Sequence, residues 1–174
     1  RTEENALWSF APHDVAVILR LIGALPVEVT CVGGSYITPN LADATVSTLH
    51  FSTGQRAHVF VSWLNPFKEQ KLVIMGERKM AVFNDVEPDH KLVLFNQRVD
   101  FDGRQPILQR NGEIPEEISS DEPLRRECEH FLNCVATRQM PLTDGASGVQ
   151  VLRVLEACQE SLQANGRPVT LNEH

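Results

Sequence analysis

The sequence has little that would indicate a nucleic-acid-binding, membrane or secreted protein. Among its 174 residues, 16 Lys and Arg stand against 23 Asp and Glu, a net charge of −7 at pH 7. That balance argues against nucleic acid as a partner, because phosphate binding needs clustered basic side chains. No apolar run is long enough to span a bilayer, and no Asn-x-Ser/Thr sequon is present. We therefore expect a protein that works away from membranes and nucleic acid.

Metal-binding and disulfide patterns are also missing. The four cysteines are Cys31, Cys128, Cys134 and Cys158. Their positions give no C-x-x-C pair and no other zinc-ligand spacing, which favours structural roles and a reducing, cytoplasmic environment. His50 and His58 could face one another across a hairpin, but no further ligands accompany them. We expect no metal site.

A dinucleotide-binding signature is absent as well. Gly145-Ala146-Ser147-Gly148 opens a helix but follows no strand, and Cys31-Val32-Gly33-Gly34 also departs from the G-x-G-x-x-G pattern. We therefore expect no Rossmann domain in this chain. A hydrolase based on His13, Asp14 and Asp43 is disfavoured, since no G-x-S-x-G nucleophile motif is present and adjacent helical residues point about 100° apart.

The composition is that of an ordinary globular protein, with 42% hydrophobic and 22% charged residues. The length predicts one domain over residues 1–174. The chain reads as a helix, a run of strands, and then helices. This order predicts an α+β fold with an open, mainly antiparallel mixed β-sheet and helices on one face. The expected strands are 27–37, 43–51, 56–64, 71–75, 80–84 and 91–96, with a possible edge strand at 168–171. Residues 101–119 read as a loop with at most one short strand.

Helical spacing predicts three helices. The first runs from about Pro12 to Ile22 and ends at Gly23. The second follows a cap at Ser120 or Asp121 and ends before Met140-Pro141, and the third starts at Thr143 or Asp144 and stops at Asn165-Gly166. Core stripes are expected on the last two helices, at Leu124, Cys128, Phe131, Leu132 and Val135, and at Val149, Leu152, Leu155, Cys158 and Leu162.

The strand at 56–64 has apolar residues in both of its alternating sets. Val59 and Val61 fall in one set, whereas Phe60 and Leu64 fall in the other. A sheet face open to water normally alternates cleanly, so the second face needs a partner of its own. We expect that face to self-associate, giving a homodimer or tetramer.

The segment Asn5 to Asp14 is the most informative one. Pro12 suits the first position of a helix, which would place His13 at the helix mouth. The helix dipole disfavours a cation there, so a neutral His13 could exchange a proton with a ligand. A histidine that only hydrogen-bonds a neighbouring loop is the alternative.

The same segment resembles the start of the C-terminal domain of Gfo/Idh/MocA oxidoreductases, the glucose–fructose oxidoreductase and inositol dehydrogenase family. His13 matches the family's histidine, Ser9 stands where an aspartate is usual, and Asn5 stands where the last glycine of a glycine-rich stretch would be. Residues 7–14 are similar to the branch that acts on nucleotide-linked sugars. The likeness continues through 62–66, 72–76, 128–132, 141–145 and the apolar helix at 149–162.

The resemblance implies the substrate and oligomerisation half of an NAD(P)-dependent sugar dehydrogenase, whose Rossmann domain and catalytic lysine would precede these residues. It implies proton transfer by His13 and a substrate wall that includes Asn5, Trp8 and Ser9, with Trp63 and Lys68 as further candidates. Ser9 cannot carry the charge of the usual aspartate, which leaves His13 with more of the task. The chain by itself is expected to bind no cofactor and to be inactive. A stand-alone, non-catalytic carbohydrate-binding or dimerisation domain is the alternative.

Overall fold

The computed structural model describes residues 4–119 and 121–171, with the backbone alone for 97–100 and 108–111. The chain divides into two compact units. Unit 1 combines the described residues of Arg1–Leu64 and Phe131–His174, and unit 2 is Asn65–His130. Whether they act as the single domain expected from the sequence stays a prediction.

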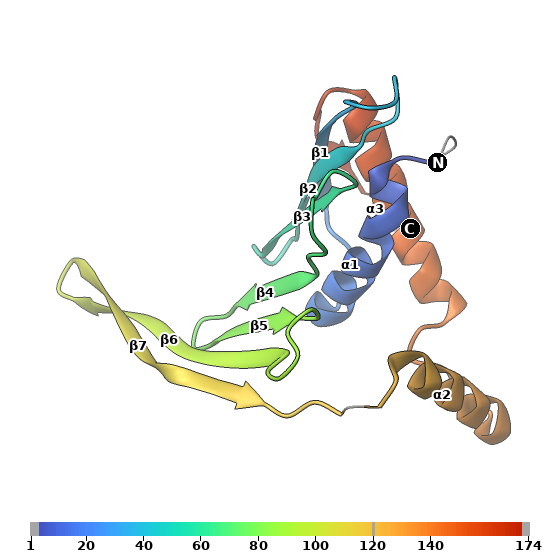
Figure 1. Cartoon of the computed structure of the whole chain (residues 1–174). Coiled ribbons are helices and arrows are strands. Elements are labelled where there is room, and N and C mark those ends of the chain that lie inside the picture. Colours follow the sequence, from blue (N-terminus) through green and yellow to red (C-terminus); the bar gives the residue numbers. More distant parts are fainter. Residues whose placement is uncertain (1–3, 120, 172–174) are drawn as a thin grey trace. The chain divides into compact units, whose positions relative to one another are not determined.

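Unit 1 is a four-stranded antiparallel sheet covered on one face by two helices (Figure 1). Its strand order is β3-β2-β1-β8. The strands are β1 (Glu28–Gly34), β2 (Ala44–His50), β3 (Arg56–Ser62) and β8 (Val169–Thr170), and the helices are α1 (Ala6–Ile22) and α3 (Gly145–Gln163). The expected hairpin of 43–51 and 56–64 is confirmed, and so is the edge strand after Pro168.

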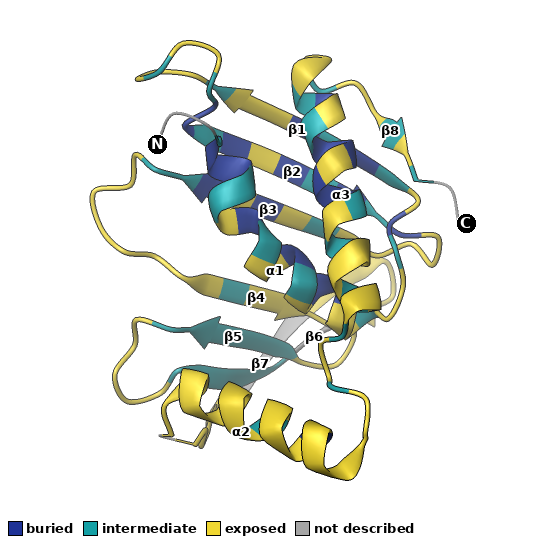
Figure 2. Cartoon of the chain, turned by 90° about the vertical axis from the view of Figure 1, so that its right-hand side faces the viewer, coloured by how far each residue is buried: buried dark blue, intermediate teal, exposed yellow. Residues whose placement is uncertain are grey.

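Alternate residues of the strands form the core of unit 1 beneath α1 and α3, as the dark blue positions of Figure 2 show. The buried apolar strand residues are Val29, Cys31, Leu49, Val59 and Val61. Leu7 of α1 and Leu155 of α3 are each only 1% exposed. Burying a leucine side chain contributes roughly 1.5–3 kcal/mol, so this helix-on-sheet packing is the main source of stability in the unit.

The start of α1 corrects the expected boundary. The helix begins at Ala6, not at Pro12, because Asn5 is its N-cap and accepts a hydrogen bond from the backbone N–H of Trp8. Pro12 lies inside the helix. The C-terminal end is as expected, with Gly23 in the left-handed conformation at φ 75°.

Helix α3 starts as expected, with Asp144 as its N-cap, and its C-terminal half enters the core at Val154, Leu155 and Cys158. Its N-terminal half does not, since Val149 and Leu152 are exposed. The expected stripe is therefore core over only part of its length.

Unit 2 contains a second antiparallel sheet, with the order β4-β5-β6-β7. Its strands are β4 (Lys71–Met75), β5 (Met80–Asn84), β6 (Leu92–Asp102) and β7 (Gln105–Glu116). The loop expected at 101–119 is wrong, because most of it is the edge strand β7, which pairs with an extended β6. Pro106 and Pro115 suggested a loop, but an edge strand tolerates residues without a backbone N–H.

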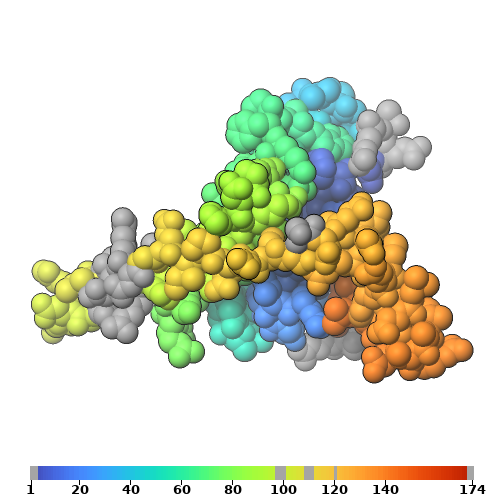
Figure 3. Space-filling model, turned by 60° about the horizontal axis from the view of Figure 1, so that its bottom comes forward, coloured from blue at the N-terminus to red at the C-terminus, as the bar shows by residue number. Residues whose placement is uncertain are grey.

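Helix α2 (Pro123–Thr137) crosses the division between the two units. Pro123 occupies its first position, as expected, whereas the proposed cap Ser120 lies outside the described residues. The expected core stripe is wrong for this helix, because its five residues are exposed, although Cys134 of the same helix is buried. Figure 3, coloured by residue number, shows the α2 segment in orange. The exposed members are Leu124, Cys128, Phe131, Leu132 and Val135.

The α+β class with antiparallel pairing and helices on one sheet face is confirmed. Every strand pair in the described part of the chain is antiparallel. In the same residues, no helix has the length and apolar character needed to cross a bilayer.

Candidate functional site

The residues singled out near the N-terminus form one stripe along α1. Asn5, Ser9 and His13 follow one another at four-residue intervals, and residues so spaced lie on the same helix face. His13 is exposed and Ser9 is half-buried. This stripe therefore begins at the N-cap Asn5 and ends at the solvent-exposed imidazole of His13.

The expectation that His13 lies at a helix mouth is wrong. It is the eighth residue of α1, whose bounds are Ala6 and Ile22. The dipole acts on charges within the first turn of a helix, so it gives no reason to expect a neutral His13. A chemical role for His13 is now supported by its exposure and by its place on the same helix face as Ser9, one turn further along.

Gln159 of α3 ties the start of α1 to the last long helix. Its side-chain oxygen accepts hydrogen bonds from Asn5 Nδ2 at 2.8 Å and from Trp8 Nε1 at 3.1 Å. Asn5 and Trp8 therefore use polar atoms to fix the helix, and Trp8 also packs against the core. Sequence patterns do not indicate this role of Gln159, because it lies 154 residues from Asn5.

A carboxylate accompanies Ser9. The Ser9 hydroxyl donates to Glu4 Oε1 at 3.2 Å, and Glu4 is half-buried immediately before the N-cap. The sequence analysis noted that position 9 is a serine where an aspartate is usual, but it did not identify Glu4 as a nearby acid. Negative charge is present at the stripe after all.

Asp14, the neighbour of His13, has a carboxyl pKa that burial raises, although His13 opposes the shift. The residue as a whole remains open to solvent, so the effect on stability is small. Asp43, the other acid considered for a hydrolase, is 1% exposed, and its Oδ2 accepts from the backbone N–H groups of Tyr36 and Ile37. This carboxylate holds a loop and faces no solvent.

The loop that Asp43 holds lies next to the start of α1. The backbone N–H of Ala6 donates to Ala42 O at 2.9 Å, which joins the loop to the first turn of the helix. Tyr36 is 76% exposed, yet its ring lies so close to Gly34 that a Cβ there would be 2.5 Å from it. At Gly33, a Cβ would lie 2.6 Å from the backbone oxygen of Ala44, so the two backbones approach closely there.

Trp63 and Lys68 belong to different units. Trp63, just after β3, packs against the core of unit 1, and its backbone N–H donates to Asp43 O. Lys68 lies in unit 2, where its Nζ is 3.9 Å from Asp85. The hydrogen bond from Lys91, at 2.9 Å, is the main cause that lowers the pKa of Asp85. The structure brings Trp63 to the core beside α1, but it does not relate Lys68 to His13.

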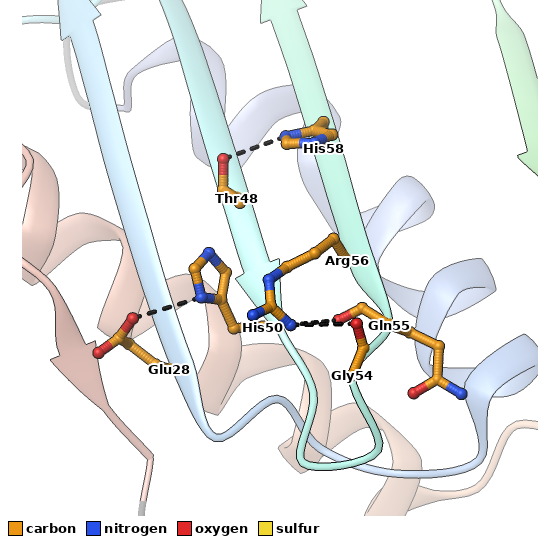
Figure 4. Close-up of polar contacts among 7 residues, drawn as sticks. All are labelled: Glu28, Thr48, His50, Gly54, Gln55, Arg56 and His58. Atoms are coloured by element: carbon orange, nitrogen blue, oxygen red, sulfur yellow. Dashed lines mark hydrogen bonds and ion pairs between the residues drawn. The ribbon is translucent and has the colours of Figure 1, made fainter. Parts of the chain in front are cut away.

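The face of the unit 1 sheet away from the helices carries cross-strand rows. Glu28 Oε1 lies 3.4 Å from His50 Nδ1, and Thr48 Oγ1 lies 3.1 Å from His58 Nδ1; Figure 4 marks both contacts. His50 and His58 do not face one another, because the register places Arg56 opposite His50 and Thr48 opposite His58. The row Val32–Val46–Phe60 is apolar, and its members are 51%, 42% and 59% exposed.

No group of His, Cys, Asp and Glu suited to a metal ion occurs among the described residues. The four cysteines, all in this part of the chain, form no disulfide. Burial raises the pKa of the Cys31 thiol, and it raises that of Cys158 to about 12. These two thiols pack inside unit 1, as expected of structural cysteines, whereas Cys128 is exposed.

Neither of two surface hollows in the described residues is lined by Ser9 or His13. One, of about 280 Å³, lies along α3 and β8, and the other, of about 640 Å³, follows the turn from Gly76 to Lys79.

Comparison with protein families identifies the fold. Residues 6–171 match the oxidoreductase family, C-terminal alpha/beta domain, of the Gfo/Idh/MocA proteins. The chain belongs to the Gfo/Idh/MocA family. A search of curated proteins finds no match.

Solved structures of this family share the fold. UDP-N-acetylglucosamine 3-dehydrogenase from Acidithiobacillus ferrooxidans aligns with a TM-score of 0.77 and 20% identity, covering 93% of this chain and 48% of that one. The WlbA dehydrogenase from Bordetella pertussis, in complex with NADH and UDP-GlcNAcA, gives 0.66 and 19%, covering 94% and 44%. A myo-inositol dehydrogenase from Corynebacterium glutamicum gives 0.69 and 21%, covering 98% and 50%. The Gfo/Idh/MocA domain described here thus spans about half the length of these enzymes.

The residues of this domain do not fit a dinucleotide. Such a cofactor needs a glycine-rich turn between a parallel strand and a helix. The described strands pair only antiparallel, and the glycine run 145–148 opens α3 without a strand before it.

Proposed function

We propose that this chain is the substrate-binding and oligomerisation half of a cytoplasmic NAD(P)-dependent dehydrogenase that acts on a sugar or nucleotide-linked sugar. The observation that supports this most strongly is the family match over residues 6–171, together with an exposed His13 on the Asn5–Ser9–His13 stripe. The nicotinamide belongs to a dinucleotide-binding domain outside these residues, and supplies the redox chemistry that side chains lack.

In this proposal His13 accepts the proton of the substrate hydroxyl. Its ring is exposed on a helix whose start is fixed by the N-cap and by Gln159, so the imidazole is presented from a rigid element. Ser9 contacts a substrate hydroxyl, and Asn5 and Trp8 form the wall behind it. Trp63 remains a candidate for a further substrate contact in unit 1, and a substrate contact by Lys68 of unit 2 remains a prediction from the sequence.

The test is kinetic and uses this chain joined to, or mixed with, its dinucleotide-binding domain. His13→Ala should lower kcat by about two to four powers of ten, the usual contribution of a general acid–base. His90→Ala, an exposed histidine in a turn of unit 2, is the matched control and should keep full activity. An unchanged rate for His13→Ala would refute the catalytic role. Sugar binding without sugar-dependent nicotinamide reduction would favour the stand-alone binding domain instead.

The outer sheet face of unit 1 supports the oligomerisation half of the proposal. In its row Glu28–His50–Arg56, β1 carries an acid and β3 carries a base, on opposite sides of β2 (Figure 4). A two-fold axis parallel to β2 would place Glu28 of one copy over Arg56 of the other, and would stack the apolar row Val32–Val46–Phe60 on itself. Such self-complementarity is what an isologous dimer requires.

Light scattering tests this interface. Phe60→Asp should convert the oligomer to monomers, because it buries a charge in the apolar row. Leu21→Asp, at an exposed site on the helix side of the sheet, is the control and should leave the mass unchanged. A monomeric parent chain, or an oligomer that survives Phe60→Asp, would count against the face-to-face arrangement.

A further inference from the structure

We propose that Glu4 is a positioning residue that acts through Ser9. Its carboxylate supplies negative charge to the face of α1 that carries His13, as an aspartate at position 9 would. The inference rests on the proposed proton transfer by His13. It explains how a chain with serine at this position could retain a charged site.

The proposal rests on a contact between Glu4, which lies just before α1, and Ser9 of that helix. Glu4 Oε1 lies 3.2 Å from the Ser9 hydroxyl, which donates to it. Both residues are half-buried, so the contact is partly shielded from water. Glu4 also precedes the N-cap Asn5, where the helix dipole favours an anion.

The helix extends this contact towards His13. Ser9 and His13 are four residues apart in the continuous α1, which places their side chains on one face and one turn apart. A serine hydroxyl can donate to a carboxylate and still accept a hydrogen bond from another group. Carboxylate, hydroxyl and imidazole therefore follow one another along the stripe.

The chemistry needs no further reactant. When the substrate O–H bond breaks and an N–H bond forms on His13, a cation appears where the imidazole was. The Glu4 carboxylate keeps its charge and stabilises that cation electrostatically, and the Ser9 hydroxyl keeps its proton. Glu4 itself touches neither the substrate nor the reacting atoms.

Glu4→Gln separates charge from structure, because its amide oxygen can still accept from Ser9. In the enzyme with its dinucleotide-binding domain, this variant should lower kcat by about fivefold, the size expected for one unit charge acting over roughly 9 Å, that is, one hydrogen bond plus one helical turn, at a half-exposed site. KM for the sugar and the thermal midpoint should stay within error. Glu160→Gln makes the same charge change at an exposed site on α3 and should leave kcat unchanged.

Rescue gives the decisive readout. Ser9→Asp should restore activity in the Glu4→Gln background, yet lower it when Glu4 is present, since two carboxylates would then be adjacent. Equal kcat for Glu4→Gln and Glu160→Gln, or failure of Ser9→Asp to rescue, would overturn the role of Glu4. If His13→Ala is fully active, the proposed function fails first. If His13→Ala is impaired and Glu4→Gln is not, only this inference fails.

Discussion

Gln159 provides the sharpest test of how α1 is held. Its single side-chain oxygen accepts from Asn5 Nδ2 at 2.8 Å and from Trp8 Nε1 at 3.1 Å, and Asn5 is only 8% exposed. Each hydrogen bond contributes about 0.5–1.5 kcal/mol net, and a buried donor left without a partner costs about 1–3 kcal/mol. Gln159→Leu keeps the size of the side chain but removes the acceptor. We therefore expect it to lower the free energy of unfolding by about 2–3 kcal/mol.

Urea unfolding of the chain measures this loss, with Trp8 as the fluorescent probe in a Trp63→Phe background, since the chain has two tryptophans. Gln159→Glu retains an acceptor for both donors and should stay within about 1 kcal/mol of the parent. Gln163→Leu, at an exposed position of the same helix, is the control and should change stability by at most about 0.5 kcal/mol. If Gln159→Leu unfolds at the same urea concentration as Gln163→Leu, the proposed anchor of α1 is refuted.

Three further outcomes follow from the structure. Asp43→Asn should destabilise unit 1 by about 1–2 kcal/mol in urea unfolding, because a charged acceptor of two backbone N–H groups becomes neutral; a neutral result would show that the loop does not depend on the charge. Native-state thiol titration at pH 7.5 should label Cys128 first and Cys158 only after unfolding, since Cys158 is buried and its pKa is about 12; rapid labelling of Cys158 would contradict its packing. The lowered pKa of Asp85 means that its stabilising contact with Lys91 is present near neutral pH and is lost as the pH falls through that pKa. The effect is about a few tenths of a kcal/mol at this half-exposed site, and Lys91→Met should remove it from the acid side of a stability–pH curve.

Sequence periodicity predicted the strands of this fold better than it predicted which faces of the helices are buried. The hairpin β2–β3 and the strands β4 and β5 were found because short alternating runs end at clear turns, and these signals are local. Strand β7 was missed because Pro106 and Pro115 indicate a loop unless the strand is known to lie at an edge. Strand order is a long-range property, so no window of sequence around β7 contains it.

Helix α2 shows a different limit. Its apolar spacing predicted an amphipathic helix correctly, but an apolar stripe says only that a partner is favourable, not that the same chain provides it. Phe131 and Leu132 are 59% and 66% exposed. Likewise, Gln159 and Glu4 could not have been found from the sequence, since each acquires its role from a contact that only the folded chain brings about.

The position of His13 depends on an energetic balance at Pro12. Proline inside a helix costs about 3 kcal/mol, which is why a helix starting at Pro12 was the natural interpretation. Starting at Ala6 instead gains the Asn5 cap, about 1 kcal/mol, and buries Leu7, roughly another 1.5–3 kcal/mol, while Ala6 and Ala11 are 0% exposed. These gains offset the proline. They also determine the chemistry, because only a helix continuous through Pro12 places Ser9 one turn from His13. Had the helix begun at Pro12, the residues before it would have no fixed relation to the imidazole, and Glu4 could not act on it.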